Sequence, residues 1–424
     1  MQMTLWFKGI GGSLVFAVLL YAGSCVYAQG CEFRLNGYVK SFFSVNGRSF
    51  LEKGPGLDSG RQKNGYIRSR LNLFGRIGDK ISLEAAYEGV LRYGQEENNE
   101  SLFLSTCQIS YRIDEVNQII HREVHGEDAF EVRQDIDRAY VALAATTADF
   151  YIGRQPISFG SARAVNPMDV IAPFSFDALD TEERKGVDAV RYRAPIGEMG
   201  ELDGGIIFAD HFKSDESAVY LNTRLSVKKT DCALMSMVFR ENLLMGLDVQ
   251  SSLKGAGYWL ETAYVFVGTT GEKRPEEDYL RVSTGFDYNF LGNLYVFIEY
   301  HFNGAGEDSA RDYLRLSDRA AYNEGQVYLL SRHYLIPGFT CIVTPLSTIR
   351  TNIMLNLEDG SLFISPRFEY SLMQDLFVEV GGFIGIGEKG RFSYNDTDGT
   401  EIPEVRSEFG IYQDLCFLSL RFYF

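Results

Sequence analysis

Hydrophobic and polar residues alternate along much of the chain, most clearly in two neighbouring segments, residues 279–290 and 294–303. A period of two is typical of a β-strand with one apolar and one polar face. Each segment supplies the ~9–11 residues that a tilted membrane strand needs. The apolar face of this predicted hairpin carries Val282, Phe286, Val296 and Ile298. We expect this apolar face to meet lipid, so an Arg at one of these positions should cost roughly 2–4 kcal/mol of stability. Ser283 lies on the opposite face, which we expect to meet water, and an Arg there should cost little.

Other segments repeat the alternation, which continues to the last residue of the chain. They are residues 66–77, 80–93, 217–228, 257–267, 348–357, 362–372, 376–387 and 415–424. An apolar strand at an unprotected chain end is an aggregation hazard in water. The hazard disappears if its outer face meets lipid and both of its edges are paired, as in a closed barrel. We therefore expect the terminal strand to close against the first one, at residues 33–46.

The predicted connections between strands alternate in length. Short ones are expected at residues 78–79, 146–148, 291–293, 344–345 and 374–375, and long, charged ones at residues 46–65, 94–130, 156–185, 268–278, 303–325 and 388–410. Short periplasmic turns and long extracellular loops are typical of an outer-membrane barrel. The expected fold class is all-β, a transmembrane antiparallel β-barrel of about 18 strands with 16 as the alternative, because an even number leaves both chain ends in the periplasm.

Composition agrees with a barrel and narrows the alternatives. The 424 residues include 42 Gly, 25 Tyr and 31 Phe but 10 Pro, a mixture that suits strands with aromatic girdles and tight turns. A soluble all-β protein would need a second sheet to cover its apolar faces. The formal net charge of −16 disfavours nucleic acid as a partner, because phosphate binding needs a basic surface. We see no second domain, so residues 29–424 are expected to form a single barrel.

The first 28 residues have the pattern of a secretory signal peptide. One Lys precedes an apolar stretch at residues 10–20, and small residues follow, so cleavage is expected after Ala28. The exported chain is expected in the outer membrane of a bacterial cell. Its scattered cysteines form neither a CxxC pair nor a Cys/His pattern, which indicates neither a zinc site nor a disulfide framework.

Two stretches carry a family resemblance. In the first, residues 137–176, a strand ending in Ile-Gly-Arg-Gln leads to a loop with Asn166, Pro167 and Asp169. The second is the tail from residue 331, with a Thr-Pro turn and a Leu-x-Asp-Gly-Ser element at residues 357–361. Together they resemble a porin-like family of bacterial outer-membrane proteins, similar in style to the alginate-export and substrate-selective porins. The resemblance implies an outer-membrane β-barrel and is not specific to one solute.

The last residue, Phe424, also fits this resemblance. A terminal aromatic residue after an alternating strand resembles the C-terminal signal by which such barrels are recognised for insertion. The alternative is that Phe424 is simply an aromatic residue at the membrane interface. Both can hold together.

Arginines at positions predicted to face the lumen are the strongest functional signal. The pore-lining candidates are Arg68, Arg70, Arg76, Arg191, Arg193, Arg281, Glu299, Arg350 and Arg367. A ladder of guanidinium groups would bind carboxylates or phosphates and select anions. Alternatively, each Arg pairs with a carboxylate on the same inner faces, and opposing rows of charge create a transverse field.

The long loop at residues 156–185 is the candidate constriction. Its apolar residues need cover, and Arg154, Arg163, Asn166 and Asp169 are the candidate functional residues in and beside it. The loop either folds into the lumen or caps the barrel from outside. In the second arrangement, a turn at its Asn-Pro pair would hold it. The sequence leaves the two arrangements equally open.

These patterns favour a passive channel for small hydrophilic, including anionic, solutes. The alternative is a barrel that presents long acidic loops at the cell surface without transport. No catalytic constellation can be argued from the sequence, so no enzymatic activity, cofactor or metal is expected. The expected partners are outer-membrane lipid, the barrel-assembly machinery and small solutes. The sequence leaves open whether the protein forms a homo-oligomer.

Overall fold

The computed structural model describes residues 26–28, 31–47, 61–95, 110–114, 120–123, 128–271, 278–394 and 401–424. The strands are β1 (Val26–Ala28), β2 (Cys31–Asn46), β3 (Gln62–Ile77), β4 (Ile81–Gln95), β5 (Ile120–Glu123), β6 (Asp128–Ala144), β7 (Asp149–Gln155), β8 (Val187–Ile196), β9 (Gly200–Ile207), β10 (Ala218–Val227), β11 (Thr230–Phe239), β12 (Asn242–Leu253), β13 (Ala256–Phe266), β14 (Tyr279–Phe290), β15 (Leu294–Asn303), β16 (His333–Thr344), β17 (Ser347–Asn356), β18 (Leu362–Met373), β19 (Leu376–Ile386), β20 (Arg391–Tyr394), β21 (Glu401–Glu404) and β22 (Leu415–Tyr423). Short helical segments are η1 (Asp210–Phe212), η2 (Ala310–Asp318) and α2 (Ala320–Asn323).

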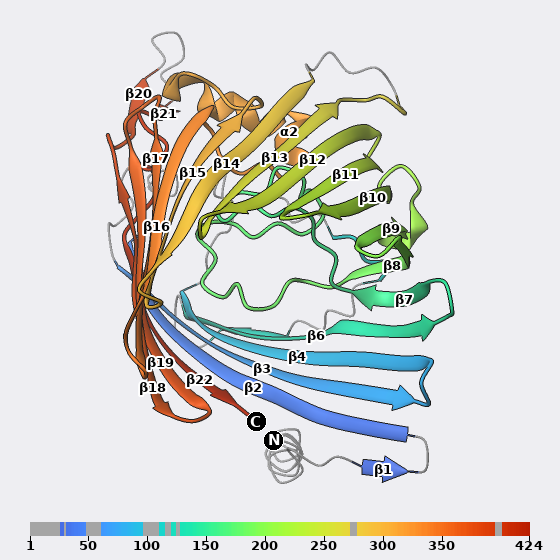
Figure 1. Ribbon diagram of the computed structural model, residues 1–424. Helices are drawn as coiled ribbons and strands as arrows, with labels where there is room; N and C mark the ends of the chain where they lie inside the picture. Colours follow the sequence, from blue (N-terminus) through green and yellow to red (C-terminus); the bar gives the residue numbers. More distant parts are fainter. Residues whose placement is uncertain are drawn as a thin grey trace.

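Within the described residues, 18 strands form one closed antiparallel barrel (Figure 1). β2 to β4 and β6 to β19 follow one another around the wall, and β22 pairs with both β19 and β2. β1 and β5 are short strands that pair with β2 and β6, and β20 and β21 form a separate hairpin. The prediction of a barrel with 18 strands is confirmed.

The last strand closes the barrel in the way its alternation predicts. Phe422, Leu420 and Leu418 lie opposite Val39, Ser41 and Phe43 of β2. Beyond them, the N–H of Gly37 donates to the Phe424 carbonyl at 2.9 Å, and the N–H of Phe424 donates to the Gly37 carbonyl at 3.0 Å. The final residue therefore belongs to the seam between the first and last strands.

The two ends of the barrel differ. Because neighbouring strands are antiparallel, alternate connections lie at the same end. One end, which we call the turn end, has short connections throughout, at residues 78–80, 145–148, 197–199, 228–229, 254–255, 291–293, 345–346 and 374–375. The other, the loop end, carries the long connections, among them residues 156–186, 304–332 and 387–414.

The outer wall is apolar, and the inner wall is polar or covered. In the hairpin β14–β15, Phe286 and Ile298 are 64% and 44% exposed, whereas Ser283 and Glu299 are fully buried. An apolar outer band suits lipid. The expectation that Ser283 faces water and tolerates Arg at little cost is wrong. Its hydroxyl donates to the Val165 carbonyl at 2.6 Å, so a larger side chain there would displace a packed loop.

Residues 156–186, which we call the lumen loop, leave the short strand β7, run through the barrel interior and return to β8 (Figure 1). The loop contacts inward-facing side chains of β2, β13, β15 and β18. Of the two arrangements that the sequence left open, the loop therefore adopts the one inside the lumen.

A hydrophobic core fills one side of the lumen. Ile157, Phe159, Met168 and Ile171 of the lumen loop pack with inward apolar side chains of β8 to β14 and with residues of η2 and α2. A second apolar cluster, which includes Val165 of the loop, Ile336 of β16 and Phe363 of β18, covers part of the other side. The spaces that remain lie between the loop and β16 to β18, and between the loop and β3, β4 and β6.

No helix in the described part of the chain is long and apolar enough to cross a membrane. Residues 1–25 of the predicted signal peptide lie outside the described residues, and residues 26–28 form β1. The signal peptide and its cleavage after Ala28 stay predictions.

Candidate solute passage

Two buried carboxylates of the wall hold the first half of the lumen loop. Glu299 of β15 accepts backbone N–H bonds from Arg163 at 2.8 Å, Ala164 at 3.3 Å and Val165 at 2.9 Å. The indole N–H of Trp259 also donates to this carboxylate, at 3.0 Å. Glu299 points inward, as the alternation predicts, but it lies beneath the loop and is fully buried. It orders the loop rather than lining the passage.

Glu261 of β13 holds the adjacent turns in the same way. Its carboxylate accepts N–H bonds from Ser161 at 2.9 Å, Ala162 at 3.0 Å and Met168 at 2.8 Å. Carboxylates make strong, charge-assisted bonds to backbone N–H groups. Together the two glutamates tie residues 161–168 to the wall.

The predicted residues of the loop itself take structural and exposed positions. The amide of Asn166 donates to the Phe159 carbonyl at 3.3 Å, and Arg281 of β14 donates to the Pro167 carbonyl at 3.3 Å from beneath the loop. Arg163 differs, because its side chain is 40% exposed and forms an ion pair of 3.0 Å with Asp287. Arg163 is therefore placed to meet a solute.

Asp169 joins the two halves of the lumen loop. Its side chain is fully buried and forms an ion pair with Arg184, whose guanidinium also donates to the Ala172 carbonyl at 2.7 Å. Burial raises the pKa of Asp169 above its usual value, although Arg184 opposes the shift.

Arg154 completes the wall where β7 ends. It pairs with Asp188 of β8 at 2.9 Å and donates to the carbonyls of Ile136 at 2.9 Å and Asp114 at 2.8 Å. It lies at the foot of the lumen loop, where it links β6, β8 and the segment at residues 110–114.

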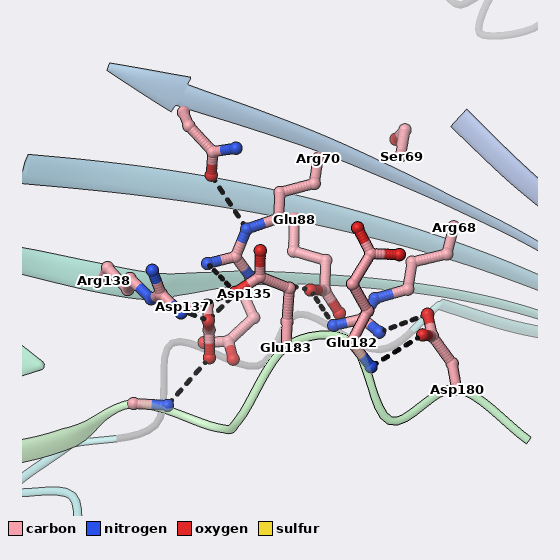
Figure 2. A network of polar contacts seen from close by, with 12 residues as sticks. Arg68, Ser69, Arg70, Glu88, Asp135, Asp137, Arg138, Asp180, Glu182 and Glu183 are labelled. Carbon is pink, nitrogen blue, oxygen red and sulfur yellow. Dashed lines mark hydrogen bonds and ion pairs between the residues drawn. The ribbon is translucent and has the colours of Figure 1, made fainter. Parts of the chain in front are cut away.

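The second half of the lumen loop meets charged side chains of β2, β3 and β6 (Figure 2). Arg68 pairs with Glu88 at 2.6 Å and with Asp180 of the loop at 2.9 Å. Arg70 pairs with Asp137 at 2.7 Å and with Glu88 at 3.4 Å. Burial alone would raise the pKa of Asp180, but the cations of Lys40 and Arg68 outweigh it and lower the pKa. These arginines are ion-paired, in contrast to a bare guanidinium ladder.

Most of the other predicted pore-lining arginines also have carboxylate partners. The ion pairs are Arg191–Asp203, Arg193–Glu201, Arg350–Glu369 and Arg367–Glu379. Arg367 in addition donates to the carbonyls of Ala178 and Leu179, at 3.0 Å and 3.1 Å. Arg76 is exposed near the turn end and has no ion pair among the described residues.

A cavity of about 350 Å³ lies between the lumen loop and β16 to β18. Four arginines line it, against one carboxylate, that of Asp169: they are Arg163, Arg184, Arg350 and Arg367. Its apolar walls include Phe174, Phe176, Tyr328 and Phe363. A second space, of about 480 Å³, lies between the loop and β3, β4 and β6, and its lining mixes both signs of charge.

Sequence reasoning missed Lys40 and Arg138, which both face the lumen loop. Lys40 was recognisable, because it shares its inward face of β2 with Tyr38 and Phe42. Arg138 was not, because a bulge in β6 skips Asp137 in the pairing with β4. The bulge turns Asp137 and Arg138 to the same side, which a strict period of two does not predict.

Within the described ranges, no group of three or more His, Cys, Asp or Glu side chains is placed to hold a metal ion. The site therefore consists of charged and aromatic side chains arranged around a folded-in loop.

No protein-family model and no curated protein sequence matches the chain. Solved structures match it in fold at low sequence identity. Pseudomonas aeruginosa OpdQ is 9% identical over 92% of this chain and 97% of its own, with a TM-score of 0.53. OccK7 (OpdD) of the same organism is 9% identical over 92% of this chain and 99% of its own, with a TM-score of 0.52. P. aeruginosa OpdK, solved with vanillate, is 9% identical over 94% of this chain and 100% of its own, with a TM-score of 0.51. The predicted porin-like barrel fold is confirmed.

Proposed function

We propose that this barrel is a channel of the bacterial outer membrane that passes small hydrophilic solutes. The apolar outer wall and the unequal lengths of the connections at the two ends support this assignment. The cavity beside the lumen loop carries it, because a polar space of about 350 Å³ inside the barrel has the size of a small-molecule site.

We further propose that the passage favours anions. Four guanidinium groups and one carboxylate line the cavity, and the carboxylates that pair with Arg163, Arg350 and Arg367 lie outside its lining, so the lining itself is basic. Arg163 and Arg350 have the most exposed side chains of the four, at 40% and 49%, so they meet a solute first. Phe174 and Phe363 add flat apolar walls. OpdK was solved with vanillate, an aromatic carboxylate, and a solute of that chemistry suits this cavity.

The reversal potential in a salt gradient across a planar bilayer tests both proposals. The double variant Arg163→Ser with Arg350→Ser should shift toward cation preference, because it removes the two accessible positive charges. Arg315→Ser is the matched control, since Arg315 is a highly exposed residue of η2 that pairs with Asp312 away from the cavity. An unchanged reversal potential in the double variant would refute the anion site. Folded, inserted protein that does not conduct, either as the wild type or in the variants that loosen the lumen loop, would refute the channel and favour a surface-presenting barrel.

The seam between the first and last strands suits the proposed role of Phe424 as the signal read by the barrel-assembly machinery. The backbone of Phe424 bonds to Gly37 in the seam, so the residue is in place when the barrel closes. The lack of enzymatic activity and the oligomeric state stay predictions.

A further inference from the structure

Residues 177–185 of the lumen loop, which we call the gate segment, lie between two fixed points. At one end, Phe176 packs against Phe363 with ring centroids 4.8 Å apart and against Tyr412 at 5.5 Å. At the other end, the N–H of Gly186 donates to Asp137 at 3.0 Å. Most residues of the segment are charged, and Leu179 is its one large apolar side chain. This composition is typical of a connecting segment held at its two ends rather than of a packed element.

The gate segment and the first half of the loop are held by different forces. Residues 157–171 contribute Ile157, Phe159, Met168 and Ile171 to the hydrophobic core. In the gate segment no residue is fully buried, and Leu179 alone packs, partly buried, against an apolar cluster. A segment with few buried apolar contacts opens at lower free energy than a packed one. Arg184 stays paired with Asp169, and Arg367 donates to the carbonyls of Ala178 and Leu179. Residues 180–183 are therefore the part of the gate segment that the loop can release while its first half stays in place.

Lys40 of β2 is the centre of the contact between the gate segment and the wall. Its ammonium lies 3.0 Å from Asp180 and 2.6 Å from Glu182, and its side chain is fully buried. The hydroxyl of Tyr423 donates to the same Glu182 carboxylate at 2.7 Å. The ring of Tyr38 lies under the ammonium, with its centroid at 4.2 Å.

Guanidinium groups of the neighbouring strands continue the contact (Figure 2). Arg68 pairs with Asp180 at 2.9 Å, and Glu183 lies 2.5 Å from Arg138 and 3.8 Å from Arg70. The carboxylates of Asp180, Glu182 and Glu183 thus form a row against a row of wall cations. We call the two rows together the ionic seal.

Most cations of the wall keep a carboxylate partner when the gate segment moves away from them. Arg68 retains Glu88, Arg70 retains Asp137, and Arg138 retains Glu84 at 2.8 Å. Among the described contacts, Lys40 alone loses both of its carboxylates. Leaving a buried cation without a partner is costly, so the open state needs water or an anion at Lys40.

We propose that the gate segment closes part of the lumen through the ionic seal, and that a solute with several carboxylates opens it by taking the place of Asp180, Glu182 and Glu183. The proposal rests on the channel function proposed above. An acid with one carboxylate replaces one member of the row, and the others still hold the segment. A tricarboxylate replaces several members in one binding event, because its linked groups act at high effective concentration.

Single-channel recording of the full-length protein in a planar bilayer tests the seal. In the triple variant Asp180→Asn, Glu182→Gln, Glu183→Gln, we expect a larger conductance and the loss of brief closures. Lys40→Met breaks the same contact from the wall side and should act in the same direction. Glu201→Gln is the matched control, because it removes a carboxylate whose partner, Arg193, lies on another strand of the wall; its traces should resemble those of the wild type.

The second arm adds propane-1,2,3-tricarboxylate or acetate at equal ionic strength. The tricarboxylate should open the wild-type channel, acetate should not, and the triple variant should respond to neither. A wild-type channel that conducts, with variants that gate identically to it, overturns the seal and leaves the channel function standing. An equal response to acetate overturns the role of multivalency. If neither the wild type nor any variant conducts, the channel function itself is overturned. If the wild type does not conduct and the variants do, the result supports the seal.

Discussion

Glu299→Ala should loosen residues 163–165 of the lumen loop while leaving the barrel closed. Three backbone N–H groups of the loop and the indole of Trp259 donate to the buried Glu299 carboxylate. A buried donor without a partner costs about 1–3 kcal/mol. Two of the four donors, the N–H of Val165 and the indole of Trp259, are buried, so at the low end of that range their loss costs about 2 kcal/mol. The loop lowers this cost by moving to where water reaches its N–H groups.

Two measurements report the loosening. Limited proteolysis with trypsin should cleave the variant after Arg163 and spare the wild type, because the loop backbone becomes accessible there. Single-channel conductance should rise, because the loop no longer narrows the lumen. Glu201→Ala is the control, since it removes one member of a wall pair whose side chains are 34% and 36% exposed and that is worth at most about 1 kcal/mol.

Protease resistance and conductance equal to those of the wild type would refute the assignment of Glu299 as the anchor of the loop. Equal cleavage of Glu299→Ala and Glu201→Ala would also refute it, because the effect would then follow from any lost carboxylate rather than from the orphaned N–H groups.

Three further predictions concern the lipid face, the seam and the loop end. Phe286→Arg should cost roughly 2–4 kcal/mol of unfolding free energy, because it places a charge among lipid chains; urea unfolding in vesicles measures the cost, and a value near zero would contradict the assigned face. Deletion of Phe424 removes both backbone bonds to Gly37 and should reduce the amount of heat-modifiable protein in the outer membrane, and a normal amount would argue against the seam. Burial raises the pKa of Glu408 from 4.5 to about 8. Between those values the folded protein holds a proton that the unfolded chain has lost, so the free energy of unfolding should fall as pH rises through this window. Glu408→Gln should flatten this dependence in thermal melts, and a slope equal to that of the wild type would refute the assignment.

The strands were predictable because lipid imposes one simple rule on every outward position. The predicted segments 279–290 and 294–303 have the bounds of β14 and β15, and the closing of the last strand on the first followed from the same alternation. Alternation also placed Ser283 and Glu299 correctly on the inner face. It could not show what covers them, because the covering loop lies more than a hundred residues earlier in the chain.

The partners of the arginines were harder to predict for the same reason. Arg68 and Arg70 point inward, as expected, but their charge is shared with carboxylates of β4, β6 and the lumen loop. A period of two shows which face a side chain occupies and carries no information about distant partners. Whether a row of guanidinium groups is free or paired depends on the path of the loop, which the sequence left open.

The number of strands sets the circumference of a barrel, but here the bore is narrowed by the apolar side chains that point inward from β8 to β14 and pack on the lumen loop. Met235 and Met237 of β11 belong to that packing, and smaller residues at such positions enlarge an interior without altering the strand pairing around it. The width of the lumen can therefore be changed from inside, in the way that a soluble enzyme reshapes its pocket. The lipid-facing surface, and the membrane insertion that depends on it, stays as it is.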